Sequence, residues 1–215
     1  MKDMDSLLAQ VLAFRPNRLV PPFDLQGHIP FVAWLVKELQ PATFVQLGTQ
    51  SGNLYFAACQ TVAEHSLPTR CWAVGTWQAE ELAQRHSVQQ EPGASDYNRQ
   101  HFGAFSGLLR MGDAQALPRF APGSIDLLLI DGRYSPETVR NEYESWRDRL
   151  SDHAVVLLVG IEQADSGAAV LWQQLQPQYP HLAFAHAQGL GVLAVGRNVP
   201  KAFQQALQAC ATPEA

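Results

Sequence analysis

The sequence predicts an α/β fold: an open, mostly parallel sheet that ends in an antiparallel hairpin. Two nearly continuous apolar runs, residues 125–130 and 154–159, are typical of parallel strands that helices cover on both faces. Strand-like and helix-like segments alternate along the middle of the chain, which indicates repeated strand–helix–strand units. Only residues 188–191 separate the last two apolar runs, so these runs should pair as a hairpin without a crossover helix.

Composition indicates one domain with a large core. The chain has 215 residues, of which 47% are hydrophobic and only 16% are charged, so long disordered tracts are not expected. We expect residues 1–42 to form a helical preface and residues 43–215 to form the α/β unit, within one structural domain. The formal net charge of -5 and the lack of a basic run disfavour nucleic acid as a partner.

The cellular setting is inferred from the cysteines and from hydropathy. Cys59, Cys71 and Cys210 are odd in number and show no C-x-x-C spacing, which favours a reduced, cytoplasmic setting over a disulfide scaffold. No apolar run reaches the roughly 18 residues that a membrane helix needs, so no membrane span is expected. The N-terminus is too acidic for a secretory signal.

The elements follow from apolar spacing and from the positions of Pro and Gly. Helices are expected over about residues 6–12, 30–39, 168–176 and 202–209. A further helix should follow a glycine-bearing loop and end at about residue 64. Core strands are expected at residues 43–47, 71–77, 108–111, 125–130 and 154–159, and hairpin strands at 182–187 and 192–195. The clearest helix follows the fourth strand. Ser135 is suited to cap it and Pro136 to begin it. Its apolar stripe consists of Val139, Tyr143, Trp146 and Leu150.

The first core strand runs directly into a glycine-bearing loop and then into a helix. The loop reads Gly48-Thr49-Gln50-Ser51-Gly52. Glycine brings bare backbone close to a ligand, and the following helix points free N–H groups at it. The same glycines would also suit a tight turn that binds nothing, so the loop is a candidate ligand site with a purely structural alternative.

Four segments together resemble class I S-adenosylmethionine (SAM)-dependent methyltransferases. They are the glycine loop and residues 74–77, 107–113 and 125–132. Residues 179–180 and 189–196 are similar to a bacterial branch of that family associated with glycosyltransferases and polysaccharide biosynthesis. The resemblance covers roughly residues 43–196. It implies a Rossmann-like sheet that binds SAM beyond the carboxyl ends of its strands.

The resemblance also implies which residues hold the cofactor. Gly48 and Gly52 would lie against its methionine part, Asp113 would accept from the adenine amino group, and Trp77 would cover the adenine face. Asp113 would otherwise simply cap the turn at residues 114–117. The implied cofactor-binding residues are Gln46, Gly48, Thr49, Gln50, Ser51, Gly52, Gly75, Thr76, Trp77, Gly112 and Asp113.

Two positions depart from the family's pattern. Relatives carry an acid where Gln46 stands, and glutamine keeps an acceptor but loses the charge that helps to orient the cofactor's ammonium. Relatives also end the second strand with an acid that takes both ribose hydroxyls, where this chain has Gly75. A charge-assisted hydrogen bond contributes about 1.5–3 kcal/mol. Its loss would weaken binding roughly tenfold to over a hundredfold.

Asp131 and His101 are the candidate catalytic residues. Asp131 closes the fourth strand, although Asp131-Gly132 is also ordinary turn chemistry. His101 would act as a base if residues 97–105 fold over the crevice, since a neutral imidazole can accept the proton of a sugar hydroxyl.

A bound metal is not expected. Metal-dependent relatives hold Mg²⁺ with acidic residues near the ends of the fourth and fifth strands. This chain keeps Asp131 at the first of these ends, and one carboxylate is a poor Mg²⁺ site unless Glu162 or Asp165 turns inward.

Two functions from different classes fit these residues. The first is a SAM-dependent O-methyltransferase that acts on a saccharide or a small hydroxylated metabolite. The second is an inactive protein of the same fold, which would serve as a binding or assembly partner in surface-glycan biosynthesis. A third departure follows the fifth strand, where relatives often carry a His-Asp pair and this chain has Gly160-Ile161. Gln46, Gly75 and Gly160 favour the second function. An exposed apolar face on an N-terminal helix would suggest a homodimer.

Overall fold

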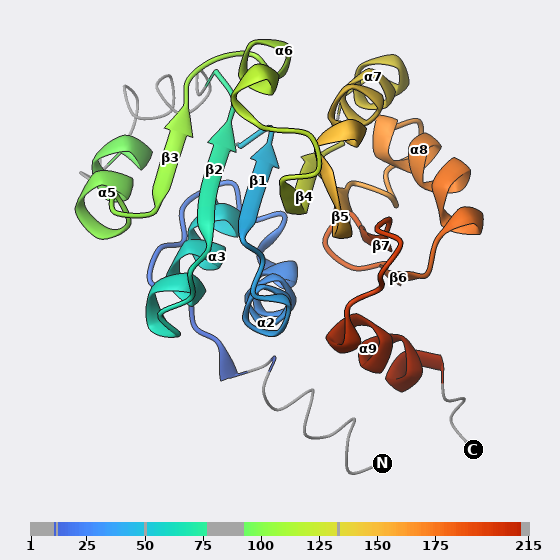
Figure 1. The fold of residues 1–215 in the computed structure, drawn as a ribbon, viewed down its shortest axis with the longest axis horizontal. Helices are drawn as coiled ribbons and strands as arrows, with labels where there is room; N and C mark the ends of the chain where they lie inside the picture. The colour runs from blue at the N-terminus through green and yellow to red at the C-terminus, as the bar shows by residue number, and fades with distance from the viewer. Residues whose placement is uncertain (1–10, 12, 50, 77–92, 133, 212–215) are drawn as a thin grey trace.

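A computed structural model shows one central sheet between two layers of helices (Figure 1). The structure describes residues 11, 13–49, 51–76, 93–132 and 134–211. The strands are β1 (Thr43–Leu47), β2 (Arg70–Val74), β3 (Ser106–Leu109), β4 (Ile125–Asp131), β5 (Leu150–Val159), β6 (His181–Phe184) and β7 (Leu190–Ala194). The α-helices are α2 (Ile29–Leu39), α3 (Asn53–Glu64), α5 (Ala94–His101), α6 (Asp113–Ala116), α7 (Pro136–Trp146), α8 (Gly167–Leu175) and α9 (Lys201–Ala211).

The sheet has the order β3-β2-β1-β4-β5-β7-β6. The strands from β1 to β5 pair in parallel, whereas β7 pairs antiparallel with both β5 and β6. The chain moves outward from β1 through β2 to β3, and then restarts on the other side of β1 with β4. The strand order therefore reverses between β1 and β4, where open α/β sheets bind their ligands. This topology confirms the predicted mostly parallel sheet with a terminal hairpin.

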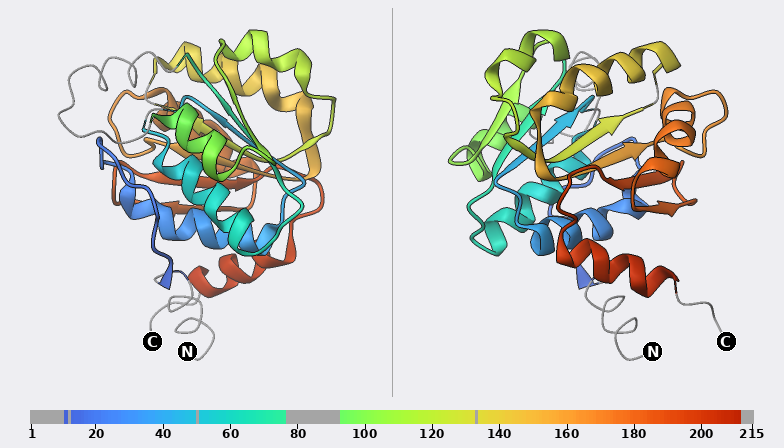
Figure 2. Two further views of the ribbon diagram at one scale, coloured as in Figure 1. Left: turned by 90° about the vertical axis from the view of Figure 1, so that its left-hand side faces the viewer. Right: turned by 45° about the vertical axis from the view of Figure 1, so that its right-hand side comes forward.

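Each face of the sheet has its own hydrophobic core. Residues of α2, α3, α5 and α9 pack on one face, and residues of α6, α7 and α8 pack on the other. The two views in Figure 2 show these helix layers on opposite sides of the strands. In β5, every residue from Ala154 to Val159 is buried, as expected for a strand that helices cover on both faces.

The helix α7 begins as the sequence predicts. Ser135 is its N-cap, and the Ser135 side chain accepts a hydrogen bond from the Thr138 N–H at 3.3 Å. Val139, Tyr143 and Trp146 form its buried face. Leu150 does not continue this stripe, because a short 3₁₀ turn (Arg147–Arg149) ends the helix first.

Several bounds differ from the predictions, including those of the hairpin strands, which are His181–Phe184 and Leu190–Ala194. The second strand ends at Val74, so residues 75 and 76 follow it. The third strand begins at Ser106 because its pairing with β2 starts opposite Cys71, two residues before the apolar pair that located it. The fifth strand begins at Leu150. The helix predicted at residues 6–12 lies almost entirely outside the described residues.

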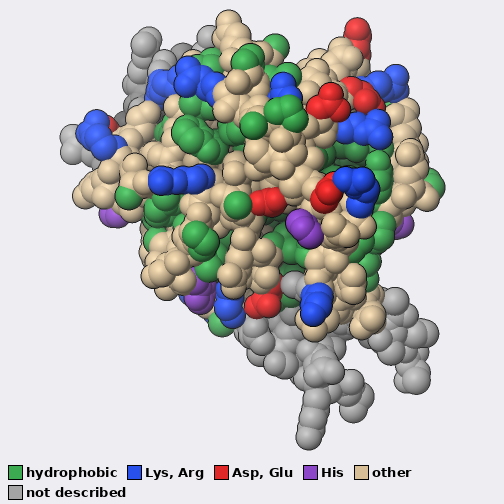
Figure 3. Space-filling view, viewed as in Figure 1, with side chains coloured by type: hydrophobic (Ala, Val, Ile, Leu, Met, Phe, Trp, Pro, Cys, Tyr) green, Lys and Arg blue, Asp and Glu red, His purple; other side chains and the backbone are tan. Residues whose placement is uncertain are grey.

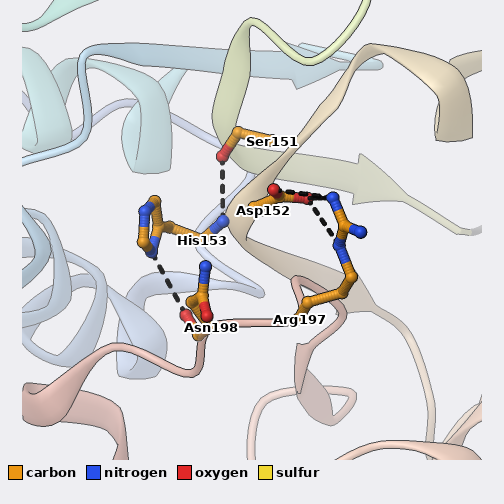
Figure 4. A network of polar contacts seen from close by, with 5 residues as sticks. All are labelled: Ser151, Asp152, His153, Arg197 and Asn198. Carbon is orange, nitrogen blue, oxygen red and sulfur yellow. Dashed lines mark hydrogen bonds and ion pairs between the residues drawn. The ribbon is translucent and has the colours of Figure 1, made fainter.

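At the amino end of the sheet, a polar network joins β5 to the segment that leads into α9 (Figure 4). Arg197 donates two hydrogen bonds to Asp152 Oδ1, at 2.8 and 3.0 Å, and a third to Oδ2 at 2.8 Å. Ser151 Oγ donates to Asp126 Oδ1 at 2.6 Å, and the His153 ring contacts the Asn198 carbonyl at 3.3 Å. The serine hydroxyl is thus committed to Asp126 and the imidazole to a main-chain carbonyl. Ser151, Asp152 and His153 therefore hold β5 to its neighbours and do not form a nucleophilic triad.

Candidate functional site

The glycine loop leaves β1 at the point where the strand order reverses. Gly48 and Gly52 have φ angles of +72° and +74°, in the left-handed region that glycine adopts without strain. A Cβ placed on Gly48 would lie 2.9 Å from the Asp131 Cβ, and one on Gly52 would lie 2.8 Å from Phe56 Cε2. Both glycines are therefore required by close approach as well as by backbone conformation. The loop brings the end of β1 against the end of β4.

A small cavity of about 10 Å³ opens at this junction. That is close to the space that one water molecule needs. The cavity is lined by Leu25, Gln46, Gly48, Ser51, Gly52, Asn53, Leu54, Leu129, Asp131 and Val159. Gln46 and Asp131 are both buried, and the Oε1 atom of Gln46 makes no hydrogen bond to any described residue. A buried acceptor without a partner costs free energy, which a ligand donor in this cavity would recover.

The end of β2 lies on the other side of the glycine loop. The Gly48 N–H and the Thr49 hydroxyl both donate to the Val74 carbonyl, at 3.1 and 3.4 Å. Gly75 follows, with its N–H donating to the Leu109 carbonyl of β3 at 3.1 Å. Among the described residues, a Cβ on Gly75 would meet only the Thr49 nitrogen, at 3.6 Å, and Gly75 has no left-handed φ. Neither the backbone nor the described neighbours require glycine here, so an aspartate would fit among the described residues.

Asp113 lies beyond the end of β3 and pairs with an acid from α7. Gly112 is the N-cap of α6, so Asp113 is the first helical residue and not the cap itself. Burial raises the pKa of Asp113, and a hydrogen bond from Glu142 partly offsets this rise. Burial also raises the pKa of Glu142 to about 8, with further contributions from the charge of Asp113, the shared hydrogen bond and the charge of Asp131. Glu142 is therefore protonated at neutral pH and donates to Asp113.

The structure does not bring the predicted residues together in every case. His101 ends α5 and comes directly before β3, whereas Asp131 ends β4, which runs in the same direction as β3. His101 thus lies at the amino end of the sheet, and the expectation that it covers the crevice is wrong. Thr76 and Gly112 are exposed beyond the ends of β2 and β3. Gln50 and Trp77 lie outside the described residues.

Metal ligands do not converge at the site. Within the described parts of the chain, no three His, Cys, Asp or Glu side chains are placed to hold an ion together. Glu162 and Asp165, the two acids that could have joined Asp131, are both exposed.

Sequence reasoning missed the residues that reach this site from far along the chain. Leu25 lines the cavity, and the Arg18 Nη1 atom donates to the Ser51 carbonyl at 2.6 Å. The Tyr134 ring is half exposed, and its Cε2 atom would lie 3.6 Å from a Cβ on Gly48. None of these contacts is local in sequence, and no motif marks them. The aromatic residue two positions after Gly132 was the available signal in the sequence.

Comparison with known proteins identifies the family. Residues 45–158 match the family model described as a methyltransferase domain, so the chain belongs to that family. It is also 36% identical over 197 residues to a protein of Sinorhizobium fredii named "Uncharacterized protein y4gI". The match covers 91% of this chain and 22% of that protein, so the chain spans about a fifth of its relative's length.

Solved methyltransferases share the fold. The cofactor-bound Rv0187 from MTB is 17% identical and superimposes with a TM-score of 0.57, over 92% of this chain and 91% of that one. The SAH-bound methyltransferase PaMTH1 of Podospora anserina is 12% identical, with a TM-score of 0.58 over 89% and 94% of the two chains. The O-methyltransferase TomG of Streptomyces achromogenes, in complex with SAM, is 14% identical, with a TM-score of 0.55 over 90% of each chain. The sheet is therefore that of class I methyltransferases. In the part of the chain that the structure describes, no helix has the length and apolar character to cross a membrane.

Proposed function

We propose that the protein is a SAM-dependent O-methyltransferase whose acceptor is a saccharide or another small hydroxylated metabolite. The observation that carries this proposal is the cavity between β1 and β4. There Gln46, whose buried Oε1 has no hydrogen-bond partner among the described residues, lines one space at the start of α3 together with the two left-handed glycines and Asp131. The bound donor would supply an electrophilic methyl group. The solved relatives with SAM or SAH bound support this choice of cofactor.

The residues of the chain suit distinct parts of this reaction. Gly48, Gly52 and the N-terminus of α3 would hold the methionine part of the donor, with Gln46 as a neutral acceptor. Asp131 would take the proton of the acceptor hydroxyl. The exposed Tyr134 ring beside Gly48 offers a flat apolar surface for an acceptor ring. Much of the acceleration would come from alignment of the two reactants.

Calorimetry with SAM and with S-adenosylhomocysteine tests the proposal. We expect micromolar binding, which Gly52→Val should abolish because its side chain would collide with Phe56 in a left-handed backbone. Gly123→Val is the matched control. Gly123 also has a left-handed φ, of +68°, but no atom of the described residues lies within 4 Å of its added Cβ. Binding that is absent or only millimolar in the wild-type protein would overturn the enzyme assignment.

One observation favours the alternative of an inactive methyltransferase fold. Gly75, which follows β2, brings no carboxylate to the ribose position. Such a protein would act as a binding or assembly partner in surface-glycan biosynthesis, alone or as a homodimer. Failure of the folded wild-type protein to bind either cofactor would support this alternative. Sedimentation would measure whether it forms dimers.

The proposed setting is the cytoplasm, with a small-molecule acceptor and no nucleic acid as partner. Cys59 and Cys71 are free thiols in the core, which supports a reducing setting. Lys and Arg side chains are scattered among acidic and apolar ones on the face shown in Figure 3, with no continuous basic stripe there.

A further inference from the structure

An N-terminal strap, residues 15–22, lies along α3 and is held by two side-chain amides. Gln60 donates to the Arg15 carbonyl at 2.9 Å and accepts from the Asn17 N–H at 2.8 Å. Asn53 donates to the Val20 carbonyl at 2.7 Å and accepts from the Val20 N–H at 3.1 Å. Asn53 and Gln60 are two helical turns apart and so lie on one face of α3. Each amide thus makes one hydrogen bond to a carbonyl and one to an N–H group of the strap backbone, as a paired β-strand does.

Arg18 lies between these two anchor points and is only 7% exposed. Its Nη1 atom donates to the Ser51 carbonyl at 2.6 Å. The guanidinium carbon lies 4.9 Å from the centre of the Phe56 ring and 5.5 Å from that of the Tyr97 ring, both within the range of cation–π attraction. One side chain thus connects the glycine loop, α3 and α5.

The bond to Ser51 fixes the orientation of a peptide group that lines the cavity. In a planar trans peptide, the C=O and N–H groups point in opposite directions. Because the Ser51 carbonyl points at Arg18, the N–H of Gly52 points away from it. Ser51 and Gly52 both line the cavity, and Gly52 is the residue before the first turn of α3. This is the position from which a helix N-terminus binds an anionic group.

The positive charge of Arg18 also favours an anionic group at the N-terminus of α3. A Cβ on Gly52 would lie 3.8 Å from Arg18 Nη1, so the guanidinium lies beside the N-terminus of α3. A helix N-terminus and a nearby cation both favour a negative group, such as the carboxylate of the methionine part of SAM.

We propose that Arg18 is a positioning residue of the donor site: it holds the Ser51–Gly52 peptide so that the Gly52 N–H and the N-terminus of α3 receive the donor's carboxylate. This inference rests on the proposed function. It adds Arg18, a residue that touches the glycine loop and not the reacting atoms.

The test compares Arg18→Met with the wild-type protein by calorimetry with S-adenosylhomocysteine and by amide hydrogen exchange. Arg18→Met keeps the length of the side chain but removes its charge and its donors. We expect binding to weaken about ten- to a hundredfold, and the Gly52 amide to exchange faster even without ligand. Millimolar guanidinium ion should restore part of the affinity of Arg18→Ala, because it can occupy the vacated site between the two rings.

Gln60→Met is the matched control, because it loosens the same strap at a point remote from the glycine loop. It should lower the melting temperature but leave the affinity within threefold of wild type. The inference is overturned if Arg18→Met lowers only the melting temperature and binds as tightly as Gln60→Met. A wild-type protein that binds no S-adenosylhomocysteine would overturn the proposed function and, with it, this inference. Tight binding by both the wild type and Arg18→Met would overturn this inference alone.

Discussion

Glu142 donates a hydrogen bond to Asp113 across the gap between α7 and the end of β3. The two acids come from distant parts of the chain and share a proton beside the predicted adenine end of the site. Burial and the neighbouring charges raise the pKa of Glu142 from 4.5 to about 8, so it keeps its proton in the folded state well after the unfolded chain has lost it.

This pair predicts that stability falls as the pH rises from about 4.5 to 8. In that window the folded state binds more protons than the unfolded state, and the free energy of unfolding therefore decreases with pH. Glu142→Gln keeps a donor for Asp113 but cannot ionise. Its melting temperature should exceed that of wild type above pH 8 and approach it near pH 5. Glu144→Gln, at an exposed position on the same helix, is the control and should leave the pH profile unchanged. A Glu142→Gln profile parallel to that of wild type would refute the assignment.

From the lowered pKa of His28 we predict that, at lower pH, stability instead increases as the pH rises. Burial and the charge of His186 lower the pKa of His28 to about 4, although hydrogen bonds to the Ala187 and His186 carbonyls act in the other direction. The unfolded chain takes up this proton near pH 6.5, so stability should fall as the pH drops from 6.5 to 4. The shift corresponds to about 3 kcal/mol at most. Urea titrations of His28→Gln across this range should show a shallower loss, and the exposed His65→Gln should behave as wild type.

Gly75→Asp should strengthen donor binding. Of the atoms that the structure describes, the added Cβ would meet only the Thr49 nitrogen, at an ordinary contact distance of 3.6 Å, and the backbone there is not left-handed. A carboxylate at the end of β2 would accept from the ribose hydroxyls. We expect S-adenosylhomocysteine to bind about tenfold tighter or more, as one charge-assisted hydrogen bond provides. Gly75→Ala supplies the Cβ without the carboxylate. Equal affinities of the two variants would show that the ribose does not lie at this position.

Asp131→Asn separates catalysis from binding. The amide has the same shape but is no base, so kcat with a saccharide acceptor should fall about a hundred- to ten-thousandfold. Affinity for S-adenosylhomocysteine should stay within threefold of wild type, because Gln46 and the glycine loop are unchanged. Asp148→Asn, exposed after α7, is the control and should keep full activity. Methylation by Asp131→Asn at more than a third of the wild-type rate would exclude Asp131 as the base.

Sequence patterns predicted the fold because each relevant signal was local. Uninterrupted apolar runs located β4 and β5, Ser135 and Pro136 located the start of α7, and the short gap before β7 indicated the hairpin. The edge strand β3 was displaced by two residues because it pairs with one strand only, and its first residues, Ser106 and Gly107, carry no apolar pattern.

The site was less predictable because its contacts join distant residues. The end of β4 and the glycine loop could be placed together from topology alone, since carboxyl ends of parallel strands share one edge. The same reasoning excludes His101, because a crossover helix ends at the amino edge before the next strand begins. Arg18 and Glu142 could not be found in this way. Their partners lie 33 and 29 residues away, and neither pair has a spacing that a pattern can detect.

Ties between the beginning and the end of the chain hold one wall of the cavity. His28 contacts the Ala187 carbonyl at 3.0 Å and His186 contacts the Gly27 carbonyl at 3.2 Å, each across 159 residues. Leu25 lines the cavity three residues before His28, so these two contacts tie one wall of the cavity to the final hairpin. We expect a variant that loosens the hairpin to loosen this wall as well.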